Sequence, residues 1–389
     1  MRVIALITDR PDPPITGSRV RNFHLWPTLS GLGPEIKVLG FDQEYSTGYT
    51  PAPGLFKGEF YCPDRAALLL RTADILLNSF HHRPRSHALM TRLQQLIDEW
   101  KPDIIHAEEL RMGRLLLGLK HKTKKFKTTC TFHNVESDLI TDTGSSPFTF
   151  CQSLIDWQHT RSLKNLEKNI INSLDLAFAY SEQDRLRYQN LYPNTKWSAT
   201  RNGTRASNLL PPLSAEGSKI LFVGSLSYKP NIDGLFWFIN NVLPLLSKNI
   251  SLTVAGSKPT EAVRNTLSHS NIRLLDTPKD LYPVYTEHTL CVIPLFAGSG
   301  TRGKILEALA HKRMVISTPL GAEGLNLMSG QGIVLASTPK EFSEKINYFV
   351  KHTYEQQRCA NDGRETVIRE YDWSVVAAQL KEAWEKCIS

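Results

Sequence analysis

Short runs of apolar residues alternate along the first half of the chain with longer segments of helical periodicity. Strands are expected at 3–7, 36–41, 103–108, 127–133 and 175–180. Helices are expected at 18–30, 87–100 and 153–172, and another opens at Ser181, where Asp184 completes a capping box. The stretch 42–85 has no readable pattern. Continuous apolar strands that each precede a helix are typical of a parallel sheet covered on both faces.

The same alternation starts again after a segment rich in Pro, Ser and Gly at 209–219. Strands are expected at 220–225, 251–256, 272–276, 289–295, 314–318 and 332–336. Helices are expected at 231–247, 258–268, 302–311, 340–351, 355–369 and 373–387. We therefore predict an α/β protein with two doubly wound domains, an N-terminal one of residues 1–208 and a C-terminal one of residues 209–370.

Composition narrows the class of protein. A chain of 389 residues with 41% hydrophobic and 22% charged residues suits two globular domains and is too apolar for disorder. The six cysteines are scattered without a C-x-x-C pair, which argues against a zinc site or a disulfide framework. The N-terminus has too few apolar residues for the core of a signal peptide, and no apolar run approaches the about 20 residues of a membrane span. A cytoplasmic protein is expected.

The formal net charge of +8 suits an anionic ligand, an acidic membrane surface or nucleic acid. Basic residues gather at 81–85 and 120–127, where they form either a solvated face or a weak contact with anionic lipid. Lipid contact would place the protein peripherally at the inner face of a membrane. No nucleic-acid partner is predicted.

Residues 296–310, "FAGSGTRGKILEALA", carry the most informative motif of the chain. A glycine-rich turn lies here between an expected strand and an expected helix. Ligands of α/β sheets bind beyond the carboxyl ends of strands, where helix N-termini expose free N–H groups. Its glycines would let the backbone approach an anion, and its hydroxyl groups would add donors. The residues of this turn are Gly298, Ser299, Gly300, Thr301 and Gly303.

The helix that follows begins with two cations. Arg302 and Lys304 oppose the helix dipole there, and a bound polyanion would remove that conflict. Glu307, one turn further, is placed to accept hydrogen bonds from the vicinal hydroxyls of a ribose. The alternative is that Glu307 only forms ion pairs with the two cations on the helix surface, which leaves the glycine-rich turn unexplained.

The same turn is a literal G-x-G-x-x-G, so an NAD-dependent oxidoreductase is an alternative. That fingerprint belongs to the first strand–helix turn of its domain, whereas this one follows the fourth expected strand of the second half. It also requires an acidic residue at the end of the next strand, and that strand ends "VISTPLG". The literal match therefore carries little weight.

The segment 298–325 resembles the donor-binding signature of the GT-B glycosyltransferases, and within them of the retaining family 4, in the branch that reads "GSGTR". The resemblance extends to 220–238, to "HNVES" at 133–137 and to "RNGT" at 201–204. It implies two Rossmann-like domains facing across a cleft, with the final helix, 371–389, packed back on the first domain. It also implies transfer of a sugar from a UDP- or GDP-linked donor to an acceptor hydroxyl, with retention, in polysaccharide, glycolipid or glycoconjugate biosynthesis.

The resemblance assigns roles on the donor side. Glu307 would hold the ribose, while Arg302, Lys304 and Lys229 would neutralise the diphosphate. His133 matches the family histidine that touches the donor sugar. The expected catalytic residues are therefore His133, Arg302 and Lys304.

Gly17 would let the loop after the first strand approach the diphosphate and the donor sugar. The candidates for contact with the acceptor or of unassigned role are Arg19, His106 and Asn134. Two positions depart from the family pattern. Ser299 replaces the first glutamate of the common E-x7-E pair, and Ser225 replaces a frequent arginine.

No D-x-D is placed after a strand to hold a metal, and the cations could stabilise the departing diphosphate by themselves. We therefore expect a metal-independent hexosyltransferase without a cofactor. Besides the oxidoreductase, two alternatives stay open. They are a nucleotide-sugar epimerase of GT-B shape and a non-catalytic nucleotide-sugar-binding protein.

Overall fold

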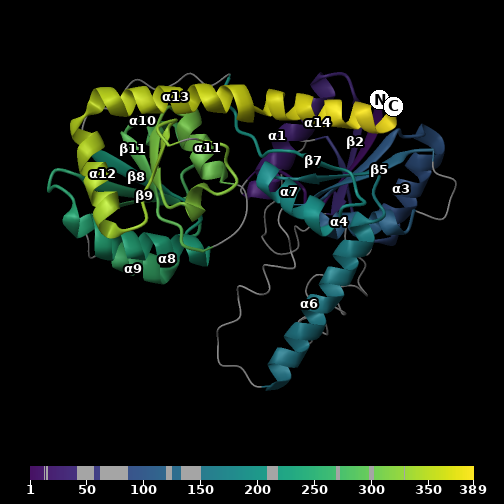
Figure 1. The fold of residues 1–389 in the computed structure, drawn as a ribbon, viewed down its shortest axis with the longest axis horizontal. Helices are drawn as coiled ribbons and strands as arrows, with labels where there is room; N and C mark the ends of the chain where they lie inside the picture. The colour runs from purple at the N-terminus through teal and green to yellow at the C-terminus, as the bar shows by residue number, and fades with distance from the viewer. Residues whose placement is uncertain are drawn as a thin grey trace. The chain divides into compact units, whose positions relative to one another are not determined.

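The structure, a computed structural model, describes residues 1–12, 14, 16–41, 57–61, 86–119, 125–132, 150–207, 218–268, 272–297, 302–327 and 329–389, with the backbone alone for 150–160. These residues form two compact units. Unit 1 contains Met1–Asn202 and Val376–Ser389, and unit 2 contains Gly203–Val375. Each unit is built on one parallel sheet with helices packed against it (Figure 1).

Among the described residues of unit 1, seven parallel strands form a sheet in the order β3-β2-β1-β4-β5-β6-β7. The strands are β1 (Arg2–Ile7), β2 (Glu35–Phe41), β3 (Glu59–Tyr61), β4 (Ile104–Glu108), β5 (Lys127–Phe132), β6 (Leu176–Ala179) and β7 (Trp197–Ala199). Because β1 pairs with both β2 and β4, the strand order reverses between β1 and β4. The carboxyl ends of two such strands are where open α/β sheets bind ligands.

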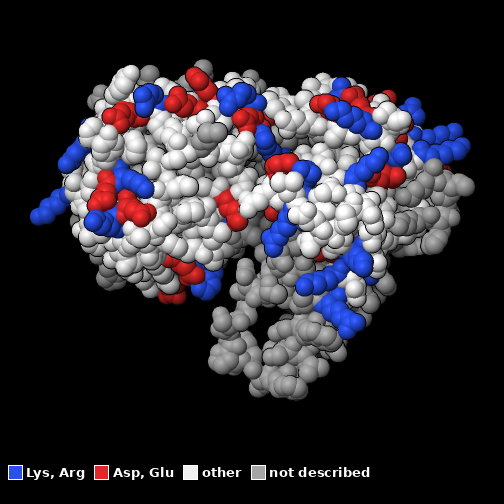
Figure 2. Space-filling model, in the orientation of Figure 1, with Lys and Arg blue, Asp and Glu red and all other residues white. Residues whose placement is uncertain are grey.

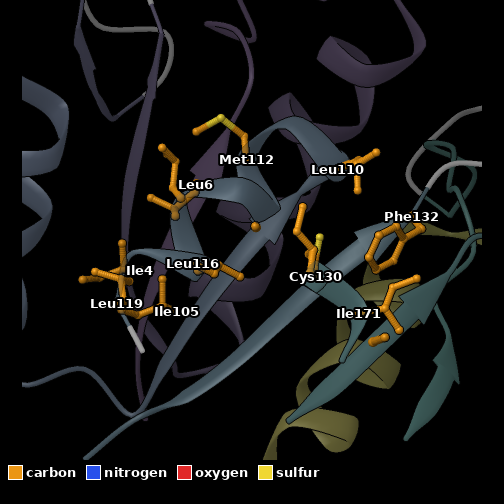
Figure 3. Close-up of a cluster of buried hydrophobic side chains, with 14 of the residues drawn as sticks. Ile4, Leu6, Ile105, Leu110, Met112, Leu116, Leu119, Cys130, Phe132 and Ile171 are labelled. Carbon is orange, nitrogen blue, oxygen red and sulfur yellow. The ribbon is translucent and has the colours of Figure 1, made fainter. Parts of the chain in front are cut away.

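The helices of unit 1 follow these strands. They are α1 (Gly17–Gly31), α3 (His87–Trp100), α4 (Glu109–Leu117), α6 (Phe150–Ile171) and α7 (Glu182–Leu191). The predicted cap of α7 is present, since the Ser181 hydroxyl accepts a hydrogen bond from the Asp184 N–H at 2.9 Å. On one face of the sheet, Leu6, Cys130 and Phe132 meet side chains of α4 in a buried cluster (Figure 3).

Among the described residues of unit 2, six parallel strands follow the order β10-β9-β8-β11-β12-β13. The strands are β8 (Lys219–Val223), β9 (Ser251–Gly256), β10 (Arg273–Asp276), β11 (Leu290–Ile293), β12 (Met314–Ser317) and β13 (Ile333–Leu335). The helices are α8 (Lys229–Trp237), α9 (Glu261–Ser268), α10 (Tyr282–Thr286), α11 (Gly303–Ala310), α12 (Pro339–Lys351) and α13 (Thr353–Tyr371). Two buried apolar clusters line the two faces of this sheet. The strand order reverses between β8 and β11, which form a pair.

The last helix, α14 (Trp373–Ile388), belongs to unit 1 from Val376 onward. In unit 1 the Trp384 ring stacks on Trp26 with centroids 6.3 Å apart. Just before α14, within unit 2, the carboxylate of Asp372 accepts hydrogen bonds from the backbone N–H groups of Ala206 and Ser207. Asp372 thus ties residues 206–207 into unit 2.

The predicted α/β fold with two doubly wound parallel sheets is confirmed. The sequence analysis missed β3 and β7, which have three residues each. It also predicted one helix over 231–247, whereas α8 gives way to a π-helical turn at Phe238–Val242 and a 3₁₀ turn at Leu243–Leu245. Pro244 lies in that last turn, where it cannot donate an α-helical hydrogen bond.

Candidate functional site

The predicted glycine-rich turn follows β11, one of the two strands at which the order of the unit 2 sheet reverses. Residues 294–297 and 302 onward are described on either side of it. Gly298, Ser299, Gly300 and Thr301 lie outside the described residues. The described residues that flank this turn, 294–297 and 302, follow the carboxyl end of β11, the edge at which α/β proteins bind their ligands.

Helix α8 packs directly against the chain that leaves β11. A Cβ atom on Gly234 would lie 2.1 Å from the carbonyl oxygen of Pro294, so only glycine permits this approach. At the end of β8, a Cβ atom on Gly224 would lie 2.9 Å from the Asn231 amide nitrogen. These contacts bring the first turn of α8 next to the segment that leads into α11.

Asn231 connects the two strand ends of this edge. The residue is 4% exposed, and its side-chain nitrogen donates to the backbone oxygen of Ser225 at 2.9 Å. The Lys304 ammonium group donates to the Asn231 side-chain oxygen at 2.6 Å. Asn231, which the sequence analysis did not select, thus holds the loop after β8 and the first turn of α11 together.

Lys304 is a cation in surroundings that disfavour its charge. Burial and, to a lesser degree, the charge of Arg302 lower the pKa of Lys304 to about 8. Among the described residues, its ammonium group donates to the neutral amide of Asn231. An anion next to Lys304 would restore the charged form.

Arg302, the N-cap residue of α11, is 6% exposed. Burial lowers its pKa, and the charge of Glu323 opposes that shift. The two side chains lie 3.7 Å apart, with Glu323 about half exposed, at the carboxyl end of a short 3₁₀ turn beyond β12. The carboxylate of Glu323 therefore compensates part of the buried charge of Arg302.

Glu307 lies one helical turn after Lys304. Burial raises its pKa to about 7, and the 3.4 Å hydrogen bond from the Tyr285 hydroxyl offsets only part of this rise. Tyr285 is itself fixed by stacking on His311, with ring centroids 4.4 Å apart. Lys304 thus contacts Asn231 and Glu307 contacts Tyr285, and the two charged side chains do not pair with each other.

Two other donor-side candidates lie at the start of α8. The Ser225 hydroxyl is 3.1 Å from that of Ser227. Lys229 has a side chain that is 83% exposed and forms an ion pair of 2.6 Å with Asp233. Both lie at the carboxyl edge of the unit 2 sheet, but Lys229 is held on the surface of α8, while Lys304 is partly buried.

In unit 1, Gly17 and Arg19 lie in the first turn of α1. A Cβ atom on Gly17 would meet no described atom within 4 Å, so packing within the described residues does not require glycine here. His106 is fully buried, and its two ring nitrogens lie 2.8 Å from the Thr129 hydroxyl and 3.0 Å from that of Thr131. His133 and Asn134 lie outside the described residues.

A hydrogen-bonded cluster occupies the switch point of unit 1. Glu109, the first residue of α4, accepts hydrogen bonds from the hydroxyls of Thr8 at 2.8 Å and Ser18 at 2.6 Å. Its φ angle of 73° is in the left-handed region, which costs a residue other than glycine about 1–2 kcal/mol. The strained Glu109 therefore fixes the chain after β1 and the first turn of α1 against α4.

A second buried network lies behind this cluster. The guanidinium group of Arg21 donates to Glu108 at 3.3 Å, to the Thr200 hydroxyl at 3.1 Å and to the Arg201 backbone oxygen at 2.8 Å. Arg21 thus connects α1 and β4 to the last residues of unit 1 before the chain enters unit 2.

Within the described ranges, no three His, Cys, Asp or Glu side chains gather in an arrangement that could hold a metal ion. The helices in the described part of the chain all lack the length or the apolar composition needed to cross a membrane.

Comparison with protein families finds two matches that together cover most of the chain. A model described as "Glycosyltransferase Family 4" matches residues 10–206, and one described as "Glycosyl transferases group 1" matches residues 217–352. A curated relative, an uncharacterized 44.6 kDa protein of the cps region of Klebsiella pneumoniae, is 29% identical over 172 residues. That match covers 41% of this chain and 44% of the relative, so less than half of either protein.

Solved structures share the fold over nearly the whole chain. Sucrose-phosphate synthase from Thermosynechococcus elongatus has a TM-score of 0.71 at 15% identity, over 99% of both chains. Anabaena HepE in complex with UDP-glucose has a TM-score of 0.67 at 13% identity, over 99% of this chain and 100% of that one. At such identities the likeness establishes the fold.

Proposed function

Because the chain belongs to glycosyltransferase family 4, with a match that spans about half of its residues, we propose that it transfers a hexose from a nucleotide-diphosphate sugar to an acceptor hydroxyl, with retention at the anomeric carbon. HepE, which shares the fold, was solved with UDP-glucose, which supports a UDP-linked donor. A GDP-linked donor is the second possibility. The acceptor would belong to polysaccharide, glycolipid or glycoconjugate biosynthesis.

One observation carries this proposal: two cations lie at the amino end of α11, Arg302 buried and Lys304 partly buried. Arg302 and Lys304 sit where the strand order of unit 2 reverses, and burial disfavours the charge of both. A diphosphate bound there would compensate both charges and would meet the free N–H groups of the helix N-terminus. Since negative charge grows on the diphosphate as the sugar leaves, the same cations would stabilise the transition state.

The other residues take supporting roles in the proposed complex. Glu307 would accept hydrogen bonds from the ribose hydroxyls, which would compensate its buried carboxylate. Gly298, Ser299, Gly300 and Thr301 would surround the diphosphate, and Lys229 would add a surface charge. His133 would touch the donor sugar, and Gly17 would leave room for it.

None of the three alternatives, an oxidoreductase, an epimerase or a non-catalytic binding protein, gains support from a specific observation. The G-x-G-x-x-G follows β11, the fourth strand of the unit 2 sheet, whereas the dinucleotide fingerprint belongs after the first strand, here β8. An epimerase or a non-catalytic binding protein would use the same diphosphate contacts. Product analysis with and without an acceptor separates these from a transferase.

The test begins with a panel of nucleotide sugars in a thermal-shift assay, since a ligand that binds only the folded state raises the melting temperature. With the donor so identified, Lys304→Met should lower kcat about 10²–10³-fold, as removal of one preorganised donor to a developing oxyanion does. The exposed Lys248, in the same unit, provides the control Lys248→Met, which should retain full activity.

Turnover by Lys304→Met at the wild-type rate would contradict the assigned role of this lysine. The same assay tests metal independence. Activity should persist in EDTA, because the proposed site neutralises the diphosphate with side chains. Complete loss in EDTA and recovery with magnesium would show that a metal is required.

We further propose a weak contact with an anionic membrane surface. The described part of α6 exposes Arg161, Lys164 and Lys168, while its acidic residue, Glu167, is buried. Figure 2 shows that the coloured side chains near this part of α6 are mostly blue, whereas blue and red are interspersed on the visible face of unit 2. Such a basic face is attracted to anionic lipids.

A further inference from the structure

We propose that Asp9 binds a hydroxyl group of the acceptor, and that the acceptor presents a neutral polyhydroxyl group, such as a sugar, to the switch point of unit 1. This inference rests on the proposed sugar transfer and assigns a side chain to its second substrate. Asp9 lies two residues beyond β1, the strand that pairs with β4 where the order of the sheet reverses. Open α/β sheets bind ligands at that edge.

One carboxylate oxygen of Asp9, Oδ1, is buried and has no hydrogen-bond partner among the described residues. The hydroxyls of Thr8 and Ser18 do not serve it, because both donate to Glu109. A buried carboxylate oxygen without a donor is unfavourable, and most such groups in folded proteins are satisfied. A hydroxyl group of a ligand would supply the missing donor.

The charges around Asp9 indicate which kind of ligand fits. Burial raises the pKa of Asp9, the charges of Arg19 and Arg111 lower it, and that of Glu109 raises it. The carboxylates of Asp9 and Glu109 and two guanidinium groups thus act at the same position, and their two negative and two positive charges balance. Because the four charges balance, these surroundings give a charged ligand no net attraction, and they suit neutral hydroxyl groups, which both donate and accept hydrogen bonds.

The test uses Asp9→Asn on the full chain, with methyl α- and β-hexopyranosides as probes of the acceptor site. Their binding is followed by saturation-transfer NMR, with and without the nucleotide sugar that gives the largest thermal shift. Because Asp9 Oδ1 has no partner in the described protein, the variant should fold as the wild type does. We expect a hexoside affinity about 10–100-fold lower, as for loss of a hydrogen bond to a charged group, and an unchanged affinity for the nucleotide sugar.

Asp98→Asn provides the control, since it makes the same chemical change on the exposed surface of α3, and it should alter neither affinity. Equal affinity of Asp9→Asn and wild type for the hexosides would overturn the proposal, as would the absence of binding to the wild type. Failure of every nucleotide sugar to bind would refute the proposed function instead. In that case a loss of hexoside binding in Asp9→Asn would still support the assignment of Asp9.

Discussion

Replacing Glu307 by glutamine should stabilise the protein at alkaline pH, although it removes a residue proposed to bind the donor. Burial raises the pKa of Glu307 from the ordinary 4.5 to about 7. A carboxyl group whose pKa is raised on folding contributes stability that is fully present below pH 4.5 and is lost as the pH rises through 7. Glutamine carries no charge and keeps an acceptor for the Tyr285 hydroxyl, so the variant avoids this loss.

The expected gain in stability of Glu307→Gln follows from the shift in the pKa of Glu307. A difference of two and a half pKa units corresponds to about 3 kcal/mol, and partial exposure of the side chain reduces it to about 2–3 kcal/mol. For a unit as large as Gly203–Val375, the melting temperature should rise by about 4–12 °C at pH 8. At pH 5, where the folded protein holds the proton, the gain should be below about 1 kcal/mol.

Differential scanning calorimetry at the two pH values measures both gains. The control is Glu344→Gln on α12, whose side chain is 64% exposed and which should shift the melting temperature at neither pH. A loss of stability in Glu307→Gln at pH 8, or an equal gain at both pH values, would refute the reasoning. Either result would mean that the carboxylate is well compensated in the ligand-free protein.

Two further predictions concern other parts of the chain. Burial raises the pKa of Asp372, but hydrogen bonds from Ser374, Ser207 and Ala206 outweigh it and lower the pKa to about 2. Asp372→Asn should therefore lower the free energy of unfolding in urea by about 2 kcal/mol at pH 7 and by little at pH 2. The reason is that the stability contributed by the Asp372 carboxylate is present above pH 3.8 and is lost as the pH falls through 2. An equal loss at both pH values would contradict this prediction. Vesicles that contain phosphatidylglycerol should bind the protein in sedimentation, and glutamates in place of Lys164 and Lys168 should weaken binding by about 1 kcal/mol or more per residue. Equal binding to neutral vesicles would disprove the membrane contact.

The sequence predicted the strands and helices of both sheets because most of them bury continuous apolar runs. The two missed strands, β3 (Glu59–Tyr61) and β7 (Trp197–Ala199), lie at the edges of the unit 1 sheet and are too short to show a period. The predicted domain boundary after 208 differs from the division after Asn202. Residues 203–207 join unit 2 through the long-range hydrogen bonds of Asp372, which no local pattern reveals.

Within the candidate sites, the sequence indicated the charged residues of α11 because they break a local rule, cations at a helix N-terminus. It could not indicate Asn231, whose role arises from a hydrogen bond to Lys304 across 73 positions of sequence. It missed Asp9 and Glu109 for the same reason. Thr8 and Ser18 reach the Glu109 carboxylate across 101 and 91 positions, and Asp9 Oδ1 is left without a donor among the described residues.

The pairing pattern on α11 is itself an argument for a ligand with two chemical parts. Lys304 and Glu307 are three residues apart on one helix, a spacing at which opposite charges can form an ion pair. Instead each contacts a neutral group, Asn231 or Tyr285, and burial drives each toward its uncharged form. A ligand with an anionic group and a hydroxyl pair about one helical turn apart would compensate both at once. The diphosphate and ribose of a nucleotide have that arrangement, so the geometry favours a nucleoside diphosphate, and family membership favours a sugar as the group transferred.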